Sequence, residues 1–258
     1  NYPKLYKLPT IITKTNHSKR IRKIKIGPQV SSSKDEIKIL IVGETGSGKT
    51  TFINCIANYL YGVKWGDDCR FIVAPNGYEY EKNVLMGNAV DDYITEYTFY
   101  WQPGFAVSYT VTLIDTPGFH NYLILNQHES LLKKINDFGI EYLNAVAITI
   151  QSSTPRLNSF YHSFFDSIMK LFGNDIANNF IIITTFVDAG EPIVLDSLRD
   201  NHVPTDYVGK FNNSALYGEF KGKYSLINKI FWDIGQESIK NIFKYSEKME
   251  PKSLNHFS

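Results

Sequence analysis

Residues 43–50 of this 258-residue chain read GETGSGKT, and this octapeptide constrains the fold more than any other stretch. It matches the pattern G-x-x-x-x-G-K-S/T at every fixed position, namely Gly43, Gly48, Lys49 and Thr50. The preceding residues 37–42, IKILIV, are apolar and largely β-branched, as in a buried strand. Residues 51–60, TFINCIANYL, repeat apolar side chains at helical spacing. The octapeptide is therefore predicted to be a phosphate-binding loop between a strand and a helix.

The residue types of this loop suit the binding of phosphate groups. Glycines let backbone N–H groups turn inward toward phosphate oxygens, and the following helix adds the positive end of its dipole. Lys49 is suited to β- and γ-phosphates, and Thr50 offers a hydroxyl to Mg²⁺. The residues predicted to contact a nucleotide here are Gly43, Glu44, Thr45, Gly46, Ser47, Gly48, Lys49, Thr50 and Thr51. The competing interpretation, a glycine-rich turn, is disfavoured by the strand and helix on either side.

Composition limits the size and the compartment of the protein. With 43% apolar and 14% aromatic residues, the chain can bury one substantial core. Its two cysteines, Cys55 and Cys69, make neither a disulfide framework nor a metal site, which fits a reducing compartment. No apolar run reaches transmembrane length, and no signal peptide opens the chain. We expect a cytoplasmic location, with a peripheral contact to a membrane left open.

Charge is distributed unevenly along the chain. Residues 1–30 hold eight Lys or Arg and no Asp or Glu, although the net charge of the whole chain is only +1. The basic segment 14–25 alternates charged and apolar residues, which predicts an edge strand with one charged face. An anionic membrane or an acidic protein would suit this segment, and specific recognition of nucleic acid is not expected. The competing interpretation is a solvated arm that rests loosely on the acidic body.

Apolar runs and helical patterns alternate after residue 36. Strands are predicted at 37–42, 94–101, 107–114, 145–150, 180–185 and 207–212. Helices are predicted at 49–60, 126–138, 157–171, 192–199 and 223–246. This order is typical of an α/β fold with a mainly parallel sheet. The turn residues between 94–101 and 107–114 indicate a hairpin, so one antiparallel edge strand is expected.

A second motif, VTLIDTPG at residues 111–118, is an apolar strand that ends in D-x-x-G. Behind a phosphate-binding loop, Asp115 is suited to meet Mg²⁺ through water. The N–H of Gly118 can contact the γ-phosphate. Since hydrolysis would remove that contact, residues 119–125 are predicted to act as a switch. A plain turn after a strand is the competing interpretation.

A third motif, IIITTFVDAG at residues 181–190, is an apolar strand followed by T-x-x-D. The carboxylate of Asp188 can accept hydrogen bonds from the ring N–H and the exocyclic amine of guanine, whereas adenine offers no such donors. Thr185 and Phe186 are predicted to contact the nucleotide at the same strand end. Backbone N–H groups of Ser214 and Ala215 are expected to face the guanine carbonyl oxygen. An ordinary loop aspartate is the competing interpretation of Asp188.

With these motifs in order, the chain resembles phosphate-loop GTPases, and within them the septin and immunity-associated (AIG-type) branch. The resemblance covers roughly residues 37–250 and is carried by GETGSGKTTFIN, YTFYWQPG, TLIDTPGF, LNAVAITIQSSTPRLN, LFGNDIANNFIIITTFVDAG and FNNSALYG. It implies a three-layer G domain over residues 36–250, preceded by a basic arm and linker (1–35) and followed by a tail (251–258). It also implies GTP or GDP and Mg²⁺ as ligands, and a homodimer or oligomer formed through the nucleotide and switch face.

Several positions depart from the family pattern. Phe186 stands where most GTPases have a lysine along the base, and it is suited to pack on the guanine face. Asp91 falls where a switch threonine is expected, and its carboxylate would repel a γ-phosphate. Phe119 replaces a water-orienting glutamine, which leaves His120 as a catalytic candidate. Arg156 is a candidate to act across a dimer, with a structural ion pair as the alternative.

These observations favour a guanine-nucleotide-binding protein whose GTP hydrolysis is slow or depends on a dimer or partner. It would act as a switch or an assembly module, with a catalytic set of Lys49, Thr50, Gly118 and His120 and with Thr50 and Asp115 at the metal. The alternative is a pseudo-GTPase that binds GDP without turnover. A phosphate-loop ATPase or kinase is disfavoured by Asp188 and the Ser-Ala pair at 214–215.

Overall fold

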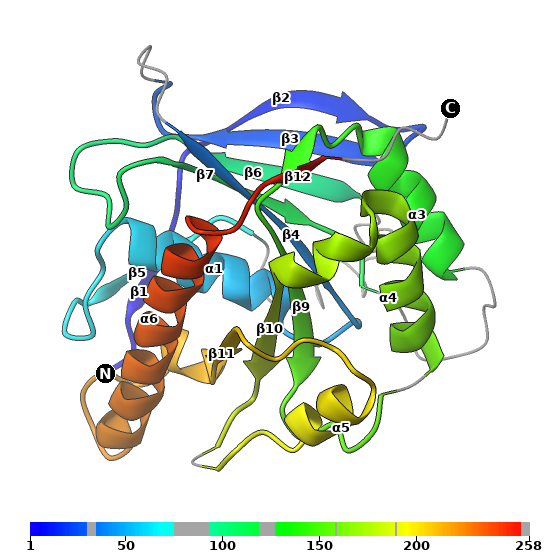
Figure 1. Ribbon diagram of the computed structural model, residues 1–258. Helices are drawn as coiled ribbons and strands as arrows, with labels where there is room; N and C mark the ends of the chain where they lie inside the picture. The colour runs from blue at the N-terminus through cyan, green and yellow to red at the C-terminus, as the bar shows by residue number, and fades with distance from the viewer. Residues whose placement is uncertain (30–34, 75–92, 119–126, 158, 189, 254–258) are drawn as a thin grey trace.

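The computed structural model describes residues 1–29, 35–74, 93–118, 127–157, 159–188 and 190–253 (Figure 1). An eight-stranded sheet with the order β11-β10-β9-β4-β7-β6-β3-β2 runs through the middle of the molecule. Helices cover both of its faces (Figure 1), with α1 and α6 on one side and α3, α4 and α5 on the other. The result is three layers, as predicted for an α/β fold.

Five neighbouring strands of the sheet are parallel: β4 (Glu36–Gly43), β7 (Thr110–Asp115), β9 (Ala145–Gln151), β10 (Phe180–Thr185) and β11 (Val208–Lys210). β6 (Ile94–Phe99) pairs antiparallel with β7, which confirms the predicted hairpin. β3 (Ile21–Ile26) lies parallel to β6, and β2 (Thr10–Asn16) closes this edge antiparallel to β3. A mainly parallel sheet with an antiparallel edge is therefore confirmed, and that edge extends beyond the predicted hairpin.

The helices lie within a few residues of their predicted positions: α1 (Lys49–Leu60), α3 (Gln127–Phe138), α4 (Ser159–Phe172), α5 (Val194–Asp200) and α6 (Ser225–Ser246). The structure also contains two short 3-10 helices, η1 (Asn174–Asn179) and η2 (Asn213–Leu216). Two short strands, β8 (Tyr142–Leu143) and β12 (Lys252–Ser253), pair with each other. No helix in the described ranges is long and apolar enough to cross a membrane.

Burial explains why these patterns form these elements. All but the first and third residues of β4 are buried, and β10 is buried throughout, because helices cover both faces of each strand. The side chains of these strands alternate between two apolar clusters, one under α3, α4 and α5 and the other under α1 and α6. The sheet therefore holds the carboxyl ends of β4, β7, β9 and β10 along one edge.

The basic N-terminal segment is part of the sheet in this structure. Instead of one strand over 14–25, two strands form, β2 and β3, with Arg20 in a left-handed conformation (φ 54°) at the turn between them. Ile24 and Ile26 are buried, and Lys23 forms an ion pair of 3.2 Å with Glu96 on β6. The turn contains neither glycine nor proline, so the sequence pattern does not mark it. The domain boundary at residue 36 stays a prediction.

A short strand outside the predicted set, β5 (Cys69–Ile72), pairs in parallel with β1 (Lys4–Lys7). Two buried amides on α1 hold β5 and the residues after it. Asn58 accepts a hydrogen bond from the N–H of Phe71, and Asn54 accepts from those of Val73 and Ala74. Helix α1 therefore fixes the described residues directly before 75–92, a segment that lies outside the described structure.

Candidate functional site

The predicted phosphate-binding loop joins β4 to α1, and close approaches favour glycine at two of its positions. A methyl group on Gly43 would lie 2.4 Å from the carbonyl oxygen of Thr149 and 2.7 Å from Oγ of Ser47. Gly48 precedes α1 with φ 94°, a left-handed conformation that favours glycine. A methyl group there would lie 3.1 Å from Cγ2 of Thr185. The loop thus has no room for a side chain at Gly43, and at Gly48 both the left-handed backbone and the tight contact with Thr185 disfavour one.

Lys49 begins α1 and folds back over the loop. Its Nζ donates hydrogen bonds of 2.8 Å to the carbonyl oxygen of Gly43 and of 2.9 Å to that of Glu44. The side chain is buried, and this burial lowers the pKa of Lys49, while the negative charges of Asp115 and Glu44 act in the opposite direction. The loop therefore holds an ammonium group at its mouth, close enough to Asp115 for the two charges to interact.

Asp115 ends β7 and is paired in register with Ile41 on the neighbouring β4. The next residue, Thr116, donates from its hydroxyl to the carbonyl oxygen of Ile41 at 2.9 Å, so the start of the 116–118 turn is fixed against β4. A methyl group on Gly118 would lie 2.6–2.8 Å from Oγ1, Cα and N of Thr45. The second predicted motif therefore reaches the phosphate loop directly.

A divalent metal at this place would have few protein ligands. Within the described ranges, no group of three or more His, Cys, Asp or Glu side chains could hold an ion. Thr50 lies half-buried in the first turn of α1, and Asp115 ends the neighbouring strand. One hydroxyl and one carboxylate fit Mg²⁺, which keeps several waters and takes its remaining ligands from phosphates. They do not fit a closed structural zinc site.

The end of β10 is tied to the phosphate loop through one hydrogen bond. The hydroxyl of Thr185 donates to the carbonyl oxygen of Ser47 at 2.7 Å, and both residues are buried. The next residue, Phe186, has φ 54° and a 59% exposed side chain. A left-handed conformation is rare for a bulky residue, and here the Ser152 hydroxyl helps to hold it by donating to the Phe186 carbonyl at 3.0 Å. The exposed ring therefore has a fixed backbone.

Two loops meet beside Phe186, and Asn212 joins them. Its Nδ2 donates to the carbonyl oxygen of Val187 at 3.0 Å, and its Oδ1 accepts from the hydroxyl of Ser214 at 2.6 Å. Asp188 is exposed, and its Oδ1 accepts from the N–H of Gly190 at 2.8 Å. The N–H of Ala215 was predicted to face a guanine carbonyl, but here it donates to the Asn212 carbonyl at 3.2 Å, because η2 turns tightly at this point.

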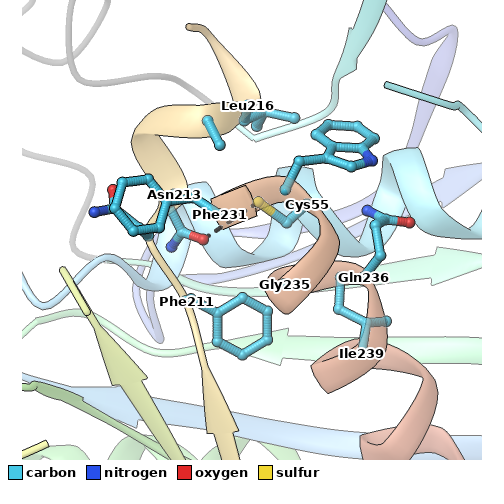
Figure 2. A pocket seen from close by; sticks show the side chains of 11 residues that line it. Cys55, Phe211, Asn213, Leu216, Phe231, Gly235, Gln236 and Ile239 are labelled. Carbon is cyan, nitrogen blue, oxygen red and sulfur yellow. Dashed lines mark hydrogen bonds between the residues drawn. The ribbon is translucent and has the colours of Figure 1, made fainter. Parts of the chain in front are cut away.

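Sequence patterns missed two polar residues of this region. Tyr161 on α4 is buried, and its hydroxyl makes a hydrogen bond with the backbone of Glu44 in the phosphate loop. Asn213 accepts a hydrogen bond of 3.4 Å from the thiol of Cys55 on α1 (Figure 2). Tyr161 belongs to no local motif, and Asn213 lies in the FNNSALYG stretch without being predicted as a site residue. Each reaches α1 or the phosphate loop only through the fold.

For several other predicted site residues, the structure describes no contact with the phosphate loop or the Asp188 loop. Asp91, Phe119 and His120 lie outside the described residues. Arg156 is exposed in the segment that leads from β9 to α4 and forms no ion pair with a described residue. Thr51 is half-buried in the first turn of α1. The phosphate loop, the 115–118 turn, Asp188 and the 212–215 loop are the parts of the predicted site that the structure brings together.

Comparison with known proteins supports this fold. A family model described as an AAA domain matches residues 35–97, which include the phosphate loop but less than half of the chain. No curated protein matches the sequence. A solved structure of Toc33 from Arabidopsis thaliana in complex with Mg²⁺ and GMPPNP aligns with a TM-score of 0.53 and 15% identity, over 85% of this chain and 88% of that chain.

Two further Toc33 structures give the same result. Toc33 in complex with GDP and Mg²⁺ has a TM-score of 0.54 and 14% identity, over 85% of this chain and 88% of that chain. A dimerization-deficient mutant of Toc33 has a TM-score of 0.53 and 14% identity, over 85% and 87%. At this level of identity the likeness shows the fold alone, which is that of a phosphate-loop G domain.

Proposed function

We propose that this chain binds guanine nucleotide and hydrolyses GTP to GDP, slowly or with the help of a dimer or partner. One observation carries the proposal: the phosphate loop, the Asp115 strand end and the Asp188 loop meet at one edge of the sheet. Ligands of α/β sheets bind at the carboxyl ends of the strands. Two of the Toc33 structures that resemble this chain contain GMPPNP or GDP with Mg²⁺, which supports the same ligand class here.

The phosphate groups would lie over residues 43–50. Glycines leave space for backbone N–H groups to approach phosphate oxygens, and α1 begins at Lys49. Nζ of Lys49 bonds to two loop carbonyls in this structure, and its third proton can reach a phosphate. Because the ammonium is buried, its attraction to a phosphate is screened less than at the surface. This loop alone supports nucleotide binding without deciding the base.

Guanine selectivity is proposed to come from Asp188. Its Oδ1 holds the turn through Gly190, and a second oxygen remains to accept from guanine. Phe186 places an exposed ring two residues earlier, which supports packing against a flat base. ATP lacks the two donors that a carboxylate would accept. Competition between GTP and ATP therefore separates this proposal from a phosphate-loop ATPase.

Hydrolysis would transfer the γ-phosphoryl group to water and release phosphate. The amides of the loop and Lys49 would stabilise charge on the phosphate oxygens. Thr50 and Asp115 are the residues that would hold Mg²⁺, which neutralises phosphate charge when bound. Gly118 packs on Thr45, so its N–H is near the loop and suited to the γ-phosphate. His120 stays a predicted catalytic residue.

Self-association through the nucleotide face is part of the proposal. One of the similar Toc33 structures is of a dimerization-deficient mutant, which supports pairing in this fold. Arg156 has an exposed side chain and no described ion-pair partner, so it is available to a second copy. An anionic membrane or an acidic protein remains the proposed partner of the basic segment 14–25, in a cytoplasmic setting.

The first experiment denatures the purified protein and identifies any released nucleotide by chromatography. A second, native sample of the same protein is incubated with Mg²⁺ and GTP, and the release of phosphate is followed. Released GDP together with turnover supports the proposal. Released GDP without turnover supports the alternative, a module that binds GDP without hydrolysis. The absence of guanine nucleotide in both tests contradicts the assignment of Asp188.

A further inference from the structure

Strand β2 is the outermost strand of the eight-stranded sheet on the side of the basic N-terminal segment (Figure 1). Its seven residues pair antiparallel with β3. Within the residues that the structure describes, the backbone of β2 forms hydrogen bonds with the backbone of β3 alone. Because alternate residues of an edge strand turn their N–H and C=O groups outward, β2 presents unpaired backbone groups along its free side.

The opposite margin of the sheet, at β11, is closed by a side chain. β11 has three residues, and α6 packs along it. The hydroxyl of Ser238 on α6 accepts a hydrogen bond of 3.0 Å from the N–H of Lys210 and donates one of 3.1 Å to the carbonyl oxygen of the same residue. One side chain thus satisfies both backbone groups of Lys210. The margin at β2 is therefore the one that stays open to a further strand.

Both faces of β2 are open as well. Residues 11–15 are exposed one after another. Since side chains alternate along a strand, Ile11 and Ile12 point to opposite faces, and their side chains are 65% and 60% exposed. A strand added beside β2 would cover part of both isoleucines. Burial of this apolar surface would then stabilise the added strand together with backbone pairing.

Charge determines which strand fits beside β2. Lys14 lies directly opposite Lys23 in the register of β2 and β3, and like charges in that position destabilise the pairing. Lys23 has an acidic partner on its other side, since it forms the ion pair with Glu96 on β6. Lys14 forms no ion pair with a described residue. An Asp or Glu opposite Lys14 on an added strand would supply the missing negative charge.

A second copy of the chain does not fit this margin. Residues 1–30 hold eight Lys or Arg and no acidic residue, so two such margins repel each other. The register also shifts between Ile12 and Lys14, and both bulges and edge lysines oppose self-pairing of sheets. We propose that β2 is the docking site of an extended acidic segment of another protein, which adds a strand to the sheet. This inference rests on the proposed function, in which segment 14–25 has an anionic partner. An anionic membrane would attract the same charges but would leave the backbone groups of β2 unpaired.

The test uses a fluorescent heptapeptide of alternating valine and glutamate, which matches the seven residues of β2 in length. Three comparisons separate the causes of binding. A peptide with lysine in place of glutamate tests charge, the acidic peptide N-methylated at every amide tests backbone pairing at constant charge, and phosphatidylserine vesicles test a membrane. The wild type is expected to bind the acidic peptide at least about 10-fold more tightly than either altered peptide, since each loses several favourable contacts. Amide hydrogen exchange in residues 10–16 should slow only with the unmodified acidic peptide.

Lys14→Glu and Lys240→Glu are the matched variants. Both replace an exposed lysine, but Lys240 lies on α6, which packs at the opposite margin of the sheet. Lys14→Glu is expected to bind the acidic peptide about 5- to 10-fold more weakly and the lysine peptide more tightly, because an opposite-charge pair becomes a like-charge pair and the reverse. Lys240→Glu should bind both peptides as the wild type does. A gain for one peptide cannot come from misfolding, so the variant remains informative.

Three results overturn the inference. If the wild type binds the acidic peptide and its N-methylated form equally, charge alone attracts the peptide and no strand is added. If it binds the vesicles but not the peptide, the partner is a membrane. If it binds neither, β2 has no acidic partner. GDP binding is measured on the same samples: intact GDP binding beside a failed peptide leaves the nucleotide function standing, whereas absent GDP binding contradicts the proposed nucleotide function whatever the peptide does.

Discussion

The hydroxyl of Thr185 at the end of β10 donates a hydrogen bond of 2.7 Å to the carbonyl oxygen of Ser47 in the phosphate loop. Both residues are almost fully buried, at 1% and 2% exposure, so water cannot replace this contact. The strand that leads to Phe186 and Asp188 is therefore fixed to the loop proposed to hold phosphates. The two halves of the proposed nucleotide site depend on each other through one side chain.

Thr185→Val is expected to weaken both the fold and the binding of nucleotide. Valine keeps the shape of threonine but leaves the Ser47 carbonyl without its donor, which costs about 1–3 kcal/mol. Thr184→Val is the matched control, because its hydroxyl donates to the Gly209 carbonyl on β11, away from the phosphate loop. Urea unfolding should show losses of similar size, whereas the affinity for GDP should fall more in Thr185→Val. Equal affinities in the two variants would contradict the coupling.

Gly118→Ala is expected to suppress GTP hydrolysis while GDP affinity changes little. The added methyl group would lie 2.7 Å from Cα and 2.8 Å from N of Thr45, so residue 118 must move away from the loop. Because these are backbone atoms, a second change of Thr45→Gly should not restore turnover. Phosphate release and GDP titration measure the two effects. Full activity in Gly118→Ala would show that this close approach is unimportant for turnover.

Gly46→Ala provides a contrast within the same loop. No atom lies within 4 Å of the added methyl group, but φ is +80°, so the expected cost is conformational, about 1 kcal/mol. We expect a modest fall in stability, measured by urea unfolding, and a fold that remains intact. A loss of several kcal/mol would mean that Gly46 has a contact beyond its own backbone conformation.

Lys49→Met is expected to remove part of the pH dependence of the unfolding free energy. Burial lowers the folded-state pKa of Lys49 below its ordinary value of 10.5. As pH rises from that lowered pKa toward 10.5, the unfolded chain binds more protons than the folded one, so the wild type gains stability. The unfolding free energies of the wild type and of Lys49→Met are measured at pH 7 and at pH 10. The difference, wild type minus variant, should be larger at pH 10. An unchanged difference would contradict the lowered pKa.

Local patterns predicted the phosphate loop and the main strands because their determinants are local. Gly43, Gly48 and Lys49 occupy fixed positions in eight residues, and β4 and β10 are continuous apolar runs. These features directly set backbone conformation and burial. The predicted hairpin was found for the same reason, since Pro103 and Gly104 mark its turn.

Features that depend on distant contacts escaped prediction. β5 is four residues long and is held by Asn54 and Asn58 of α1, whose roles appear only after folding. The turn at Arg20 lacks glycine and proline, so two strands were predicted as one. Asn213 meets Cys55 across 158 residues of sequence. No spacing rule connects such pairs, because the sheet order brings them together.

Asp188→Asn is expected to exchange the preference of the site from guanine to xanthine nucleotide. The carboxylate of Asp188 is proposed to accept from N1–H and the N2 amine, whereas an asparagine amide donates and would suit the carbonyl oxygen that xanthine carries at C2. Loss of charge-assisted hydrogen bonds predicts roughly 100-fold weaker GDP binding, since each contributes about 1.5–3 kcal/mol. Asparagine can still accept the bond from Gly190, so the local turn should persist. Titrations with GDP and XDP measure the exchange, and an undiminished affinity for GDP would remove Asp188 from the base site.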